Sequence, residues 1–123
     1  VLTVMTDAFW EDEANERIVM RFSPKLAPYK AAVFPLFKKE GMPEIARKLY
    51  EQLRRHTAVI YDDGGSIGKR YRRQDEIGTP FCLTVDHESL NDHAVTLRDR
   101  DSLEQIRIPI GKVPDILKEK IGL

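Results

Sequence analysis

The stretch Ala58–Asp86, AVIYDDGGSIGKRYRRQDEIGTPFCLTVD, decides the fold of this chain. Its two ends, Ala58–Tyr61 and Phe81–Asp86, are short apolar runs of the kind that predicts buried strands. The charged segment between them predicts a helix from about Ile67 to Gly78. Thr79-Pro80 ends that helix, because the residue before a proline is pushed out of the helical region. The whole stretch therefore predicts a strand–helix–strand unit.

The segments on either side extend this alternation. Before the stretch, Lys30–Leu36 predicts a buried strand, and an apolar stripe that follows Pro43 predicts a helix. After it, Ala94–Asp99 predicts a strand antiparallel to its predecessor, and Gln105–Ile110 predicts a strand with one buried isoleucine face. Val113–Ile121 predicts a last helix. The alternation indicates an α/β fold with parallel leading strands, and the closing part makes the sheet mixed.

The N-terminal region has a different pattern. Apolar residues at helical spacing predict a helix over residues 1–10, and the acidic stretch Glu11–Glu16 predicts a linker. Arg17–Phe22 predicts a short strand. The chain starts with Val1 instead of Met and shows no signal peptide, as expected of a fragment of a longer protein. We therefore place a tail and linker at residues 1–16 and the domain itself at residues 17–123.

The composition limits the possible partners. The chain has 123 residues, and its 20 basic and 20 acidic side chains give zero net charge. Nonspecific nucleic-acid binders carry a large basic excess, so this balance favours a specific reader with interleaved charges. Cys82 is the only cysteine, which excludes an internal disulfide and predicts a reducing, cytoplasmic compartment. No apolar run reaches membrane-spanning length, so we expect no membrane partner.

The predicted helix from Ile67 to Gly78 sorts its polar side chains into two groups, at about 100° per residue. Border positions of the packed face are half-buried, so we expect their polar groups to be held in place; they are Arg70, Gln74 and Asp75. The solvated side carries Lys69, Arg72, Arg73 and Glu76. A solvated helix with intrahelical ion pairs fits the spacing equally well, because charge runs are usually solvated faces.

Familiar active-site and metal motifs are not matched. Asp63 stands where a Walker loop ending at Gly68-Lys69 needs its first glycine. Cys82, His87 and His93 match no standard zinc spacing. No base is identifiable that would make Cys82 a nucleophile. The sequence therefore indicates no catalytic and no metal-binding residue.

The string Gly65–Phe81 resembles the C-terminal anticodon-binding domain of glycyl-tRNA synthetase, a class II aminoacyl-tRNA synthetase. Further matches in the family's order are Pro24–Pro28, Val33–Leu36, Tyr61–Asp63, Thr84–Asp86 and Val95–Asp101. Related histidyl, prolyl and threonyl synthetases share the domain but not this string. The resemblance implies a mixed sheet of about five strands flanked by about three helices. It also implies that residues 1–16 are the tail of a preceding catalytic-core helix and a linker.

The resemblance further implies a function. The domain would grip the anticodon stem-loop of tRNA-Gly, while a separate core makes glycyl-tRNA from glycine, tRNA-Gly and ATP with magnesium. The signature motifs of that core are absent from this sequence, so we expect neither ligase activity nor a bound cofactor in this chain alone. Family enzymes of this type are homodimers, and their subunit contacts are expected mainly in the core.

The bases to be read suggest which residues read them. Glycine anticodons end in two cytosines, and unpaired anticodon bases are stacked on aromatic or guanidinium planes and read along their Watson–Crick edges. Cytosine offers an amino donor beside two acceptors, so its pocket needs a carboxylate together with an arginine or an amide. Arg98 and Arg100 are the candidate arginines, and Asp86 and Glu88 are the matching carboxylates. The other RNA-binding candidates are Lys69, Arg70, Arg72, Arg73, Gln74 and Asp75.

Several alternatives stay open at this point. Arg98–Asp101 also fits a structural ion-pair cluster at a strand end, and Tyr71 and Phe81 fit the core better than a base-stacking role. A protein-interaction module, like the accessory subunit of mitochondrial DNA polymerase, is a second functional hypothesis. A small-molecule enzyme on a Rossmann-like sheet is a third, but the Gly-x-Gly-x-x-Gly motif is missing after the first strand.

Overall fold

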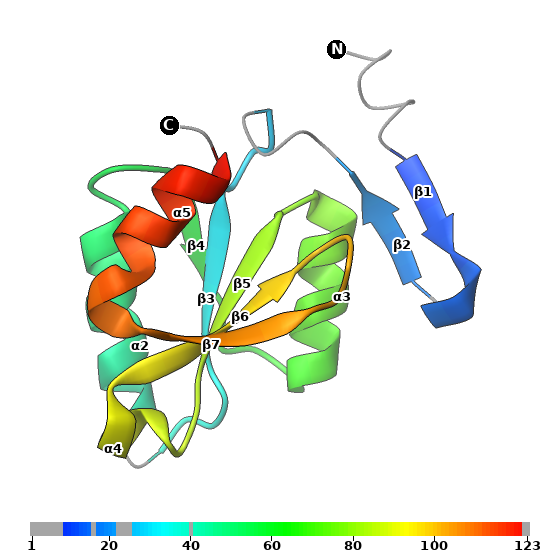
Figure 1. Cartoon of the computed structure of the whole chain (residues 1–123). Helices are drawn as coiled ribbons and strands as arrows, with labels where there is room; N and C mark the ends of the chain where they lie inside the picture. Colours follow the sequence, from blue (N-terminus) through cyan, green and yellow to red (C-terminus); the bar gives the residue numbers. More distant parts are fainter. Residues whose placement is uncertain (1–8, 16, 22–25, 40, 122–123) are drawn as a thin grey trace.

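The computed structural model describes residues 9–15, 17–21, 26–39 and 41–121, and it contains a five-stranded sheet in the order β4-β3-β5-β6-β7 (Figure 1). β3 (Ala31–Pro35), β4 (Val59–Tyr61) and β5 (Phe81–Val85) are parallel to one another. β6 (Ala94–Asp99) and β7 (Gln105–Pro109) are antiparallel additions at one side. The predicted α/β class and mixed sheet are therefore confirmed.

Helices cover both faces of this sheet. α2 (Met42–Leu53) and α5 (Val113–Ile121) pack on one face, and α3 (Ile67–Ile77) packs on the other (Figure 1). The predicted loop between β5 and β6 contains a short helix, α4 (Ser89–Asp92). Two 3-10 turns complete the elements; they are η1 (Glu13–Asn15) and η2 (Ile110–Lys112).

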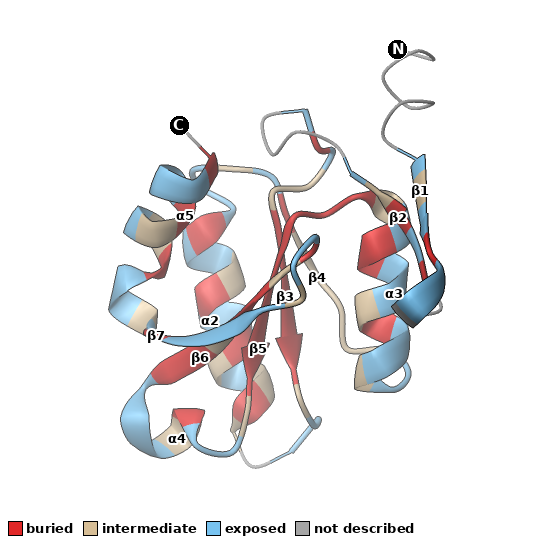
Figure 2. Ribbon diagram, turned by 45° about the vertical axis from the view of Figure 1, so that its right-hand side comes forward, coloured by how far each residue is buried: buried red, intermediate tan, exposed pale blue. Residues whose placement is uncertain are grey.

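The central strands are buried along their whole length (Figure 2). Every residue of β3 and β5 is buried, as expected for parallel strands with helices on both faces. β7 behaves differently from the prediction, because Ile106 is 46% exposed and only Ile108 is fully buried. The isoleucine face of this edge strand is therefore only partly covered.

The charged helix α3 has well-defined ends. The Ser66 hydroxyl oxygen accepts a hydrogen bond from the Lys69 backbone N–H, which is an N-cap contact. Gly78 ends the helix with φ 94°, a left-handed conformation that glycine adopts without strain. The Gly78 and Thr79 N–H groups both donate to the Gln74 carbonyl. These contacts satisfy backbone groups at both ends of α3.

A hairpin lies beside α3, outside the main sheet (Figure 1). It consists of β1 (Phe9–Asp12) and β2 (Arg17–Met20), which are antiparallel. The prediction of a linker at Glu11–Glu16 is corrected, because Glu11 and Asp12 belong to β1 and the following turn is η1. Residues 1–8 lie outside the described residues, and the last two positions of the helix predicted there, Phe9 and Trp10, are in β1.

Within the described residues, no helix has the length and apolar character needed to cross a membrane.

Candidate nucleic-acid interface

Polar side chains form two rows across the α3-facing side of β5, β6 and β7. The strand register places Cys82, Arg98 and Gln105 in one row. It places Thr84, Thr96 and Arg107 in the next row. Helix α3 covers the β5 end of these rows, where the Tyr71 hydroxyl and the Thr84 hydroxyl are 2.6 Å apart. The β7 end stays exposed, so polar groups face solvent beside the helix.

A groove of about 300 Å³ runs between α3 and this open part of the sheet. Its lining residues are Arg17, Gly68, Tyr71, Arg72, Asp75, Arg98, Leu103 and Gln105. This volume lies at the small end of the range for ligand pockets. Leu103 has a positive φ of 63°, and such backbone strain clusters at functional sites. The groove therefore combines ring, guanidinium, amide and carboxylate groups in one small space.

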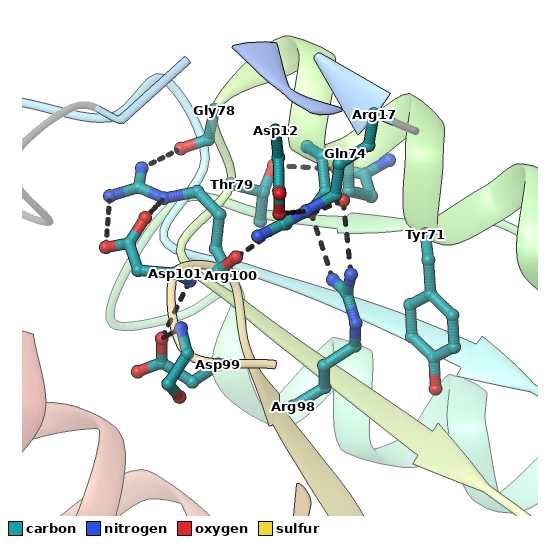
Figure 3. Close-up of polar contacts among 12 residues, drawn as sticks. Asp12, Arg17, Tyr71, Gln74, Gly78, Thr79, Arg98, Asp99, Arg100 and Asp101 are labelled. Atoms are coloured by element: carbon teal, nitrogen blue, oxygen red, sulfur yellow. Dashed lines mark hydrogen bonds and ion pairs between the residues drawn. The ribbon is translucent and has the colours of Figure 1, made fainter. Parts of the chain in front are cut away.

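Asp75 organises the inner wall of the groove. Its carboxylate accepts two hydrogen bonds from the Arg98 guanidinium, at 3.0 and 3.1 Å, in a bidentate arrangement. The same carboxylate accepts a third hydrogen bond from Arg17 Nη1, at 3.1 Å. Arg17 reaches this carboxylate from the hairpin and Arg98 reaches it from β6; both arginines are labelled in Figure 3. One buried carboxylate thus joins three separate elements.

Arg98 is held on a second side by an aromatic ring. Its guanidinium carbon lies 4.6 Å from the centroid of the Tyr71 ring, which is a cation–π contact. Burial lowers the pKa of Arg98, but the hydrogen bonds and charge of Asp75 outweigh it, so the net shift is upward. Arg98 is therefore a fixed, charged plane with 6% of its surface exposed.

Arg100 sits in the interior at the end of β6. Its Nη1 donates to the Gly78 carbonyl at 2.9 Å and to the Met20 carbonyl at 3.1 Å. Its Nε donates to Asp101 at 2.9 Å. These bonds, drawn in part in Figure 3, connect the C-terminal end of α3 with β2. The main contacts of Arg100 thus tie elements of the fold together.

Cys82 lies in the same row as Arg98 but is chemically protected. Burial raises the pKa of its thiol to about 12, with only partial compensation by Arg98. A thiol with so high a pKa is a poor nucleophile and a poor metal ligand near neutral pH. The structure therefore supports reading Cys82 as a core residue.

The outward face of α3 carries exposed cations; they are Lys69, Arg72 and Arg73. Arg73 pairs with Asp62 on the neighbouring loop, and Arg72 lines the groove. Arg70 points the other way: it is 4% exposed and donates to the Pro35 carbonyl at 2.5 Å and to the Gly65 carbonyl at 3.2 Å. Only the outward group is available to a polyanion.

A second charged cluster centres on Arg107, at the opposite end of β5 from Arg98. Arg107 contacts Asp86 at 2.8 Å and Asp92 at 2.8 Å, and Glu88 lies 3.9 Å away. Asp86 also accepts from the backbone N–H and hydroxyl of Ser89, which fixes the start of α4. The cluster therefore ties the β5–β6 loop to the edge strand β7.

These contacts shift the titration of the groups in the cluster. Burial raises the pKa of Asp86, but hydrogen bonds from Arg107 and Ser89 outweigh it and leave the pKa below its ordinary value. The hydrogen bond from Arg107 also lowers the pKa of Asp92. Hydrogen bonds to Asp92 and Asp86 in turn raise the pKa of Arg107. All three groups thus stay ionised over the physiological pH range.

Comparison with known families agrees with this geometry. Residues 30–120 match the family model described as an anticodon binding domain. The chain belongs to the anticodon-binding domain family. The protein-interaction alternative finds no support in these comparisons.

Individual relatives of this anticodon-binding domain are glycine–tRNA ligases. The chain is 57% identical to the enzyme of Geobacillus thermodenitrificans over 98% of its own length and 26% of the relative. It is 50% identical to the enzyme of Borrelia hermsii, over 98% of this chain and 28% of the relative. It is 55% identical to that of Methanococcus maripaludis, over 96% and 20%. The chain thus spans about a quarter of the length of the relatives it matches, and the sequence resemblance to glycyl-tRNA synthetases is confirmed.

The structure brings only some of the predicted site residues of the anticodon-binding domain together. Arg98 and Asp75 meet at the groove, whereas Asp86 and Glu88 lie near Arg107. Arg98 is paired in register with Cys82, four residues before Asp86, which corresponds to about 13 Å along the strand. Arg98 and the carboxylates proposed to match it are therefore not parts of one small pocket.

The helix positions predicted as half-buried are in fact fully buried. Arg70, Gln74 and Asp75 are 4%, 0% and 1% exposed. At Asp75 the hairpin adds a second covering surface through Arg17, whereas Arg70 is buried against the Pro35 and Gly65 carbonyls. Gln74 accepts a 2.7 Å hydrogen bond from the Thr79 hydroxyl, and its Nε2 has no hydrogen-bond partner among the described residues.

Sequence reasoning missed three residues of the interface: Arg17, Gln105 and Arg107. Gln105 and Arg107 alternate with the isoleucines of β7, so the signal for an exposed polar face was present. Arg17 carried no such signal, because its partners at the groove, Asp75 and Arg100, are remote in sequence. In the described ranges no group of three or more His, Cys, Asp or Glu side chains is placed to hold a metal ion.

Proposed function

We propose that this domain binds the anticodon stem-loop of tRNA-Gly and that the groove between α3 and β7 receives one anticodon base. The groove itself carries this proposal, because it offers planar groups beside an exposed amide. Unpaired RNA bases are recognised by stacking on such planes and by hydrogen bonds along their edges. The relatives named above are glycine–tRNA ligases, which supports tRNA-Gly as the RNA.

Gln105 has the chemistry that cytosine requires. Its side-chain oxygen can accept from the cytosine amino group, while its NH₂ donates to a neighbouring acceptor of the base. It is exposed at the open end of the row that contains Arg98. We assign the edge of the base to Gln105, and we assign the planar surface to Arg98 and Tyr71.

The outward cations of α3 complete the interface. Lys69, Arg72 and Arg73 project from the helix that forms one wall of the groove. Phosphate contacts hold an RNA in register but carry no base information. We therefore assign the phosphates of the loop to these three residues. Asp86 and Glu88, with Arg107, form a second polar cluster that could receive a neighbouring base.

The proposal extends to the longer protein in outline only. The parent enzyme would be a cytoplasmic, homodimeric glycine–tRNA ligase that uses ATP with magnesium in a catalytic core outside this chain. In that enzyme the present domain would supply tRNA recognition and no chemistry.

Binding of synthetic anticodon stem-loops to the 123-residue chain tests the function. We expect the stem-loop with the glycine anticodon to bind more tightly than loops in which either terminal cytosine is replaced. Gln105→Ala should reduce this discrimination by about 1–3 kcal/mol, the range for an amide contact to a base edge. Arg72→Ala should weaken all the RNAs alike and lower the salt slope by about 1.

Arg55→Ala is the matched control, because Arg55 is exposed just after α2, on the other side of the sheet. It should leave both the affinity and the discrimination unchanged. Equal binding of the wild-type chain to all the stem-loops would refute the proposed function. Normal discrimination in Gln105→Ala would remove Gln105 from the role of reader.

A further inference from the structure

Arg17 connects the hairpin to the groove through an unbroken series of charged contacts. Its Nε donates to Asp12 at 2.8 Å, on the paired strand of the hairpin. Its Nη1 donates to Asp75 at 3.1 Å and to the Arg100 carbonyl at 2.7 Å. Asp75 in turn holds Arg98 in the bidentate arrangement described above. The hairpin, α3 and β6 thus meet at one guanidinium.

The burial of Arg17 makes its position well defined. Its side chain is 4% exposed, and that of Asp75 is 1% exposed. Buried charges interact more strongly than exposed ones and are little screened by salt. Arginine holds its partners in a rigid planar fork, which lysine cannot reproduce. A displacement of this fork would therefore displace the Asp75 carboxylate.

Arg98 depends on Asp75 for its orientation. Both hydrogen bonds between Arg98 and Asp75 use the ends of the guanidinium, so the carboxylate fixes the rotation of that plane. The plane lies over Tyr71 at the wall of the groove. If Asp75 were free to turn, Arg98 would have no single orientation toward a bound base.

We propose that Arg17, which lies outside the segment matched by the family model, is a positioning residue for base recognition: it fixes Asp75, and Asp75 fixes Arg98 at the groove wall. The inference rests on the proposed function. It makes the N-terminal hairpin part of the recognition apparatus, although residues 30–120 alone carry the family match. Arg17 acts through its neighbours, with no assigned contact to the RNA.

Arg17→Lys tests this positioning role in the full 123-residue chain. The change keeps the positive charge, so long-range attraction and the salt slope should stay as in the wild type. Lysine lacks the planar fork, so the ratio of affinities for the glycine stem-loop and a cytosine-replaced stem-loop should fall by about tenfold, within the range for one base-edge contact. A merely structural role would lower both affinities together and leave the ratio intact.

Arg21→Lys is the matched control. Arg21 follows the same hairpin, is exposed, and stacks on Trp10 at 4.3 Å. Its substitution should leave the ratio unchanged. Far-UV circular dichroism establishes that each variant is folded before the ratio is compared.

Asp12→Asn provides a second variant in case Arg17→Lys does not fold. The asparagine keeps an oxygen that can accept from Arg17 Nε but removes the charge on the side of Arg17 away from Asp75. We expect a smaller fall of the ratio in the same direction. A folded Arg17→Lys, or failing that a folded Asp12→Asn, with the wild-type ratio would overturn the inference. Loss of discrimination already in the wild-type chain would instead refute the proposed function.

Discussion

Replacing Asp75 with alanine should destabilise the domain severely, and this prediction tests the charged cluster directly. The carboxylate is 1% exposed and accepts hydrogen bonds from Arg17 and Arg98, which are 4% and 7% exposed at the side chain. Removing one partner of a buried ion pair leaves uncompensated charge in the interior, at a cost of about 3–5 kcal/mol. Single domains have unfolding free energies of about 5–15 kcal/mol, so a large part of the stability would be lost.

Asp101→Ala gives the matched comparison. Asp101 also pairs with a buried arginine, Arg100, but its own side chain is 51% exposed. Arg100 keeps its hydrogen bonds to the Gly78 and Met20 carbonyls, and water can replace the exposed carboxylate, so we expect a cost near that of exposed ion pairs, about 0–1 kcal/mol. The two substitutions remove the same chemical group, so the difference between them measures the effect of burial.

Urea denaturation followed by two probes provides the assay. Far-UV circular dichroism reports on the whole domain, and Trp10, the only tryptophan, reports on the hairpin because Arg17 and Arg21 lie over its ring at 5.4 and 4.3 Å. We expect the Asp75→Ala midpoint to fall strongly in both signals and the Asp101→Ala midpoint to stay close to the wild type. Similar midpoints for the two variants would show that Asp75 does not hold the hairpin, α3 and β6 together.

Three further predictions concern other parts of the molecule. Burial raises the pKa of Asp86, but the hydrogen bonds and charge of Arg107 outweigh it, so the folded pKa lies below the ordinary aspartate value. The stability that this pair contributes is therefore present above the ordinary pKa and is lost as the pH falls through the folded pKa. Urea midpoints of the wild type and Arg107→Gln should differ at pH 7 and converge in acid. With a thiol pKa raised by burial to about 12, Cys82 should resist a thiol reagent at pH 8 in the native state and react rapidly in denaturant, and fast native reaction would contradict its burial. Gly41 has φ 86°, a backbone conformation that alanine adopts only with strain, so Gly41→Ala should lower the free energy of unfolding by about 1–2 kcal/mol. Gly68 lies on helix α3 with open space around a new Cβ, so Gly68→Ala should raise the free energy of unfolding by about 0.5–1 kcal/mol. Urea midpoints in the reverse order would refute both assignments.

The strands and helices of the main sheet could be predicted because their signals are local. β3 and β5 are buried on both faces and therefore appear as continuous apolar runs. Ser66 and Gly78 cap α3, and both are residue types with strong positional preferences. Information within a few residues was sufficient to place these elements.

In the hairpin, the strand predicted at Arg17–Phe22 is present as β2 (Arg17–Met20), but its partner β1 could not be predicted in the same way. Asp12 is 7% exposed, yet an acidic residue in an acidic stretch normally indicates a solvated linker. Its partner is the buried Arg17, which also contacts Asp75 of α3, a residue 58 positions away from Arg17 in sequence. The register that separates Arg98 from Asp86 is also a property of strand pairing, which composition does not reveal.

The division of charge between interior and surface explains how a domain of zero net charge can be suited to RNA. Arg17, Arg98 and Arg100 are buried and hold carboxylate or carbonyl oxygens, so they add rigidity and little external field. The field available to an RNA backbone comes instead from the exposed cations of α3, which stand next to the groove. In the proposed interface, Arg17 and Arg98 would hold the groove wall in place, and the exposed cations would attract the RNA. In the stem-loop assay, discrimination should therefore follow substitutions of the buried set, and the salt slope should follow substitutions of the exposed set.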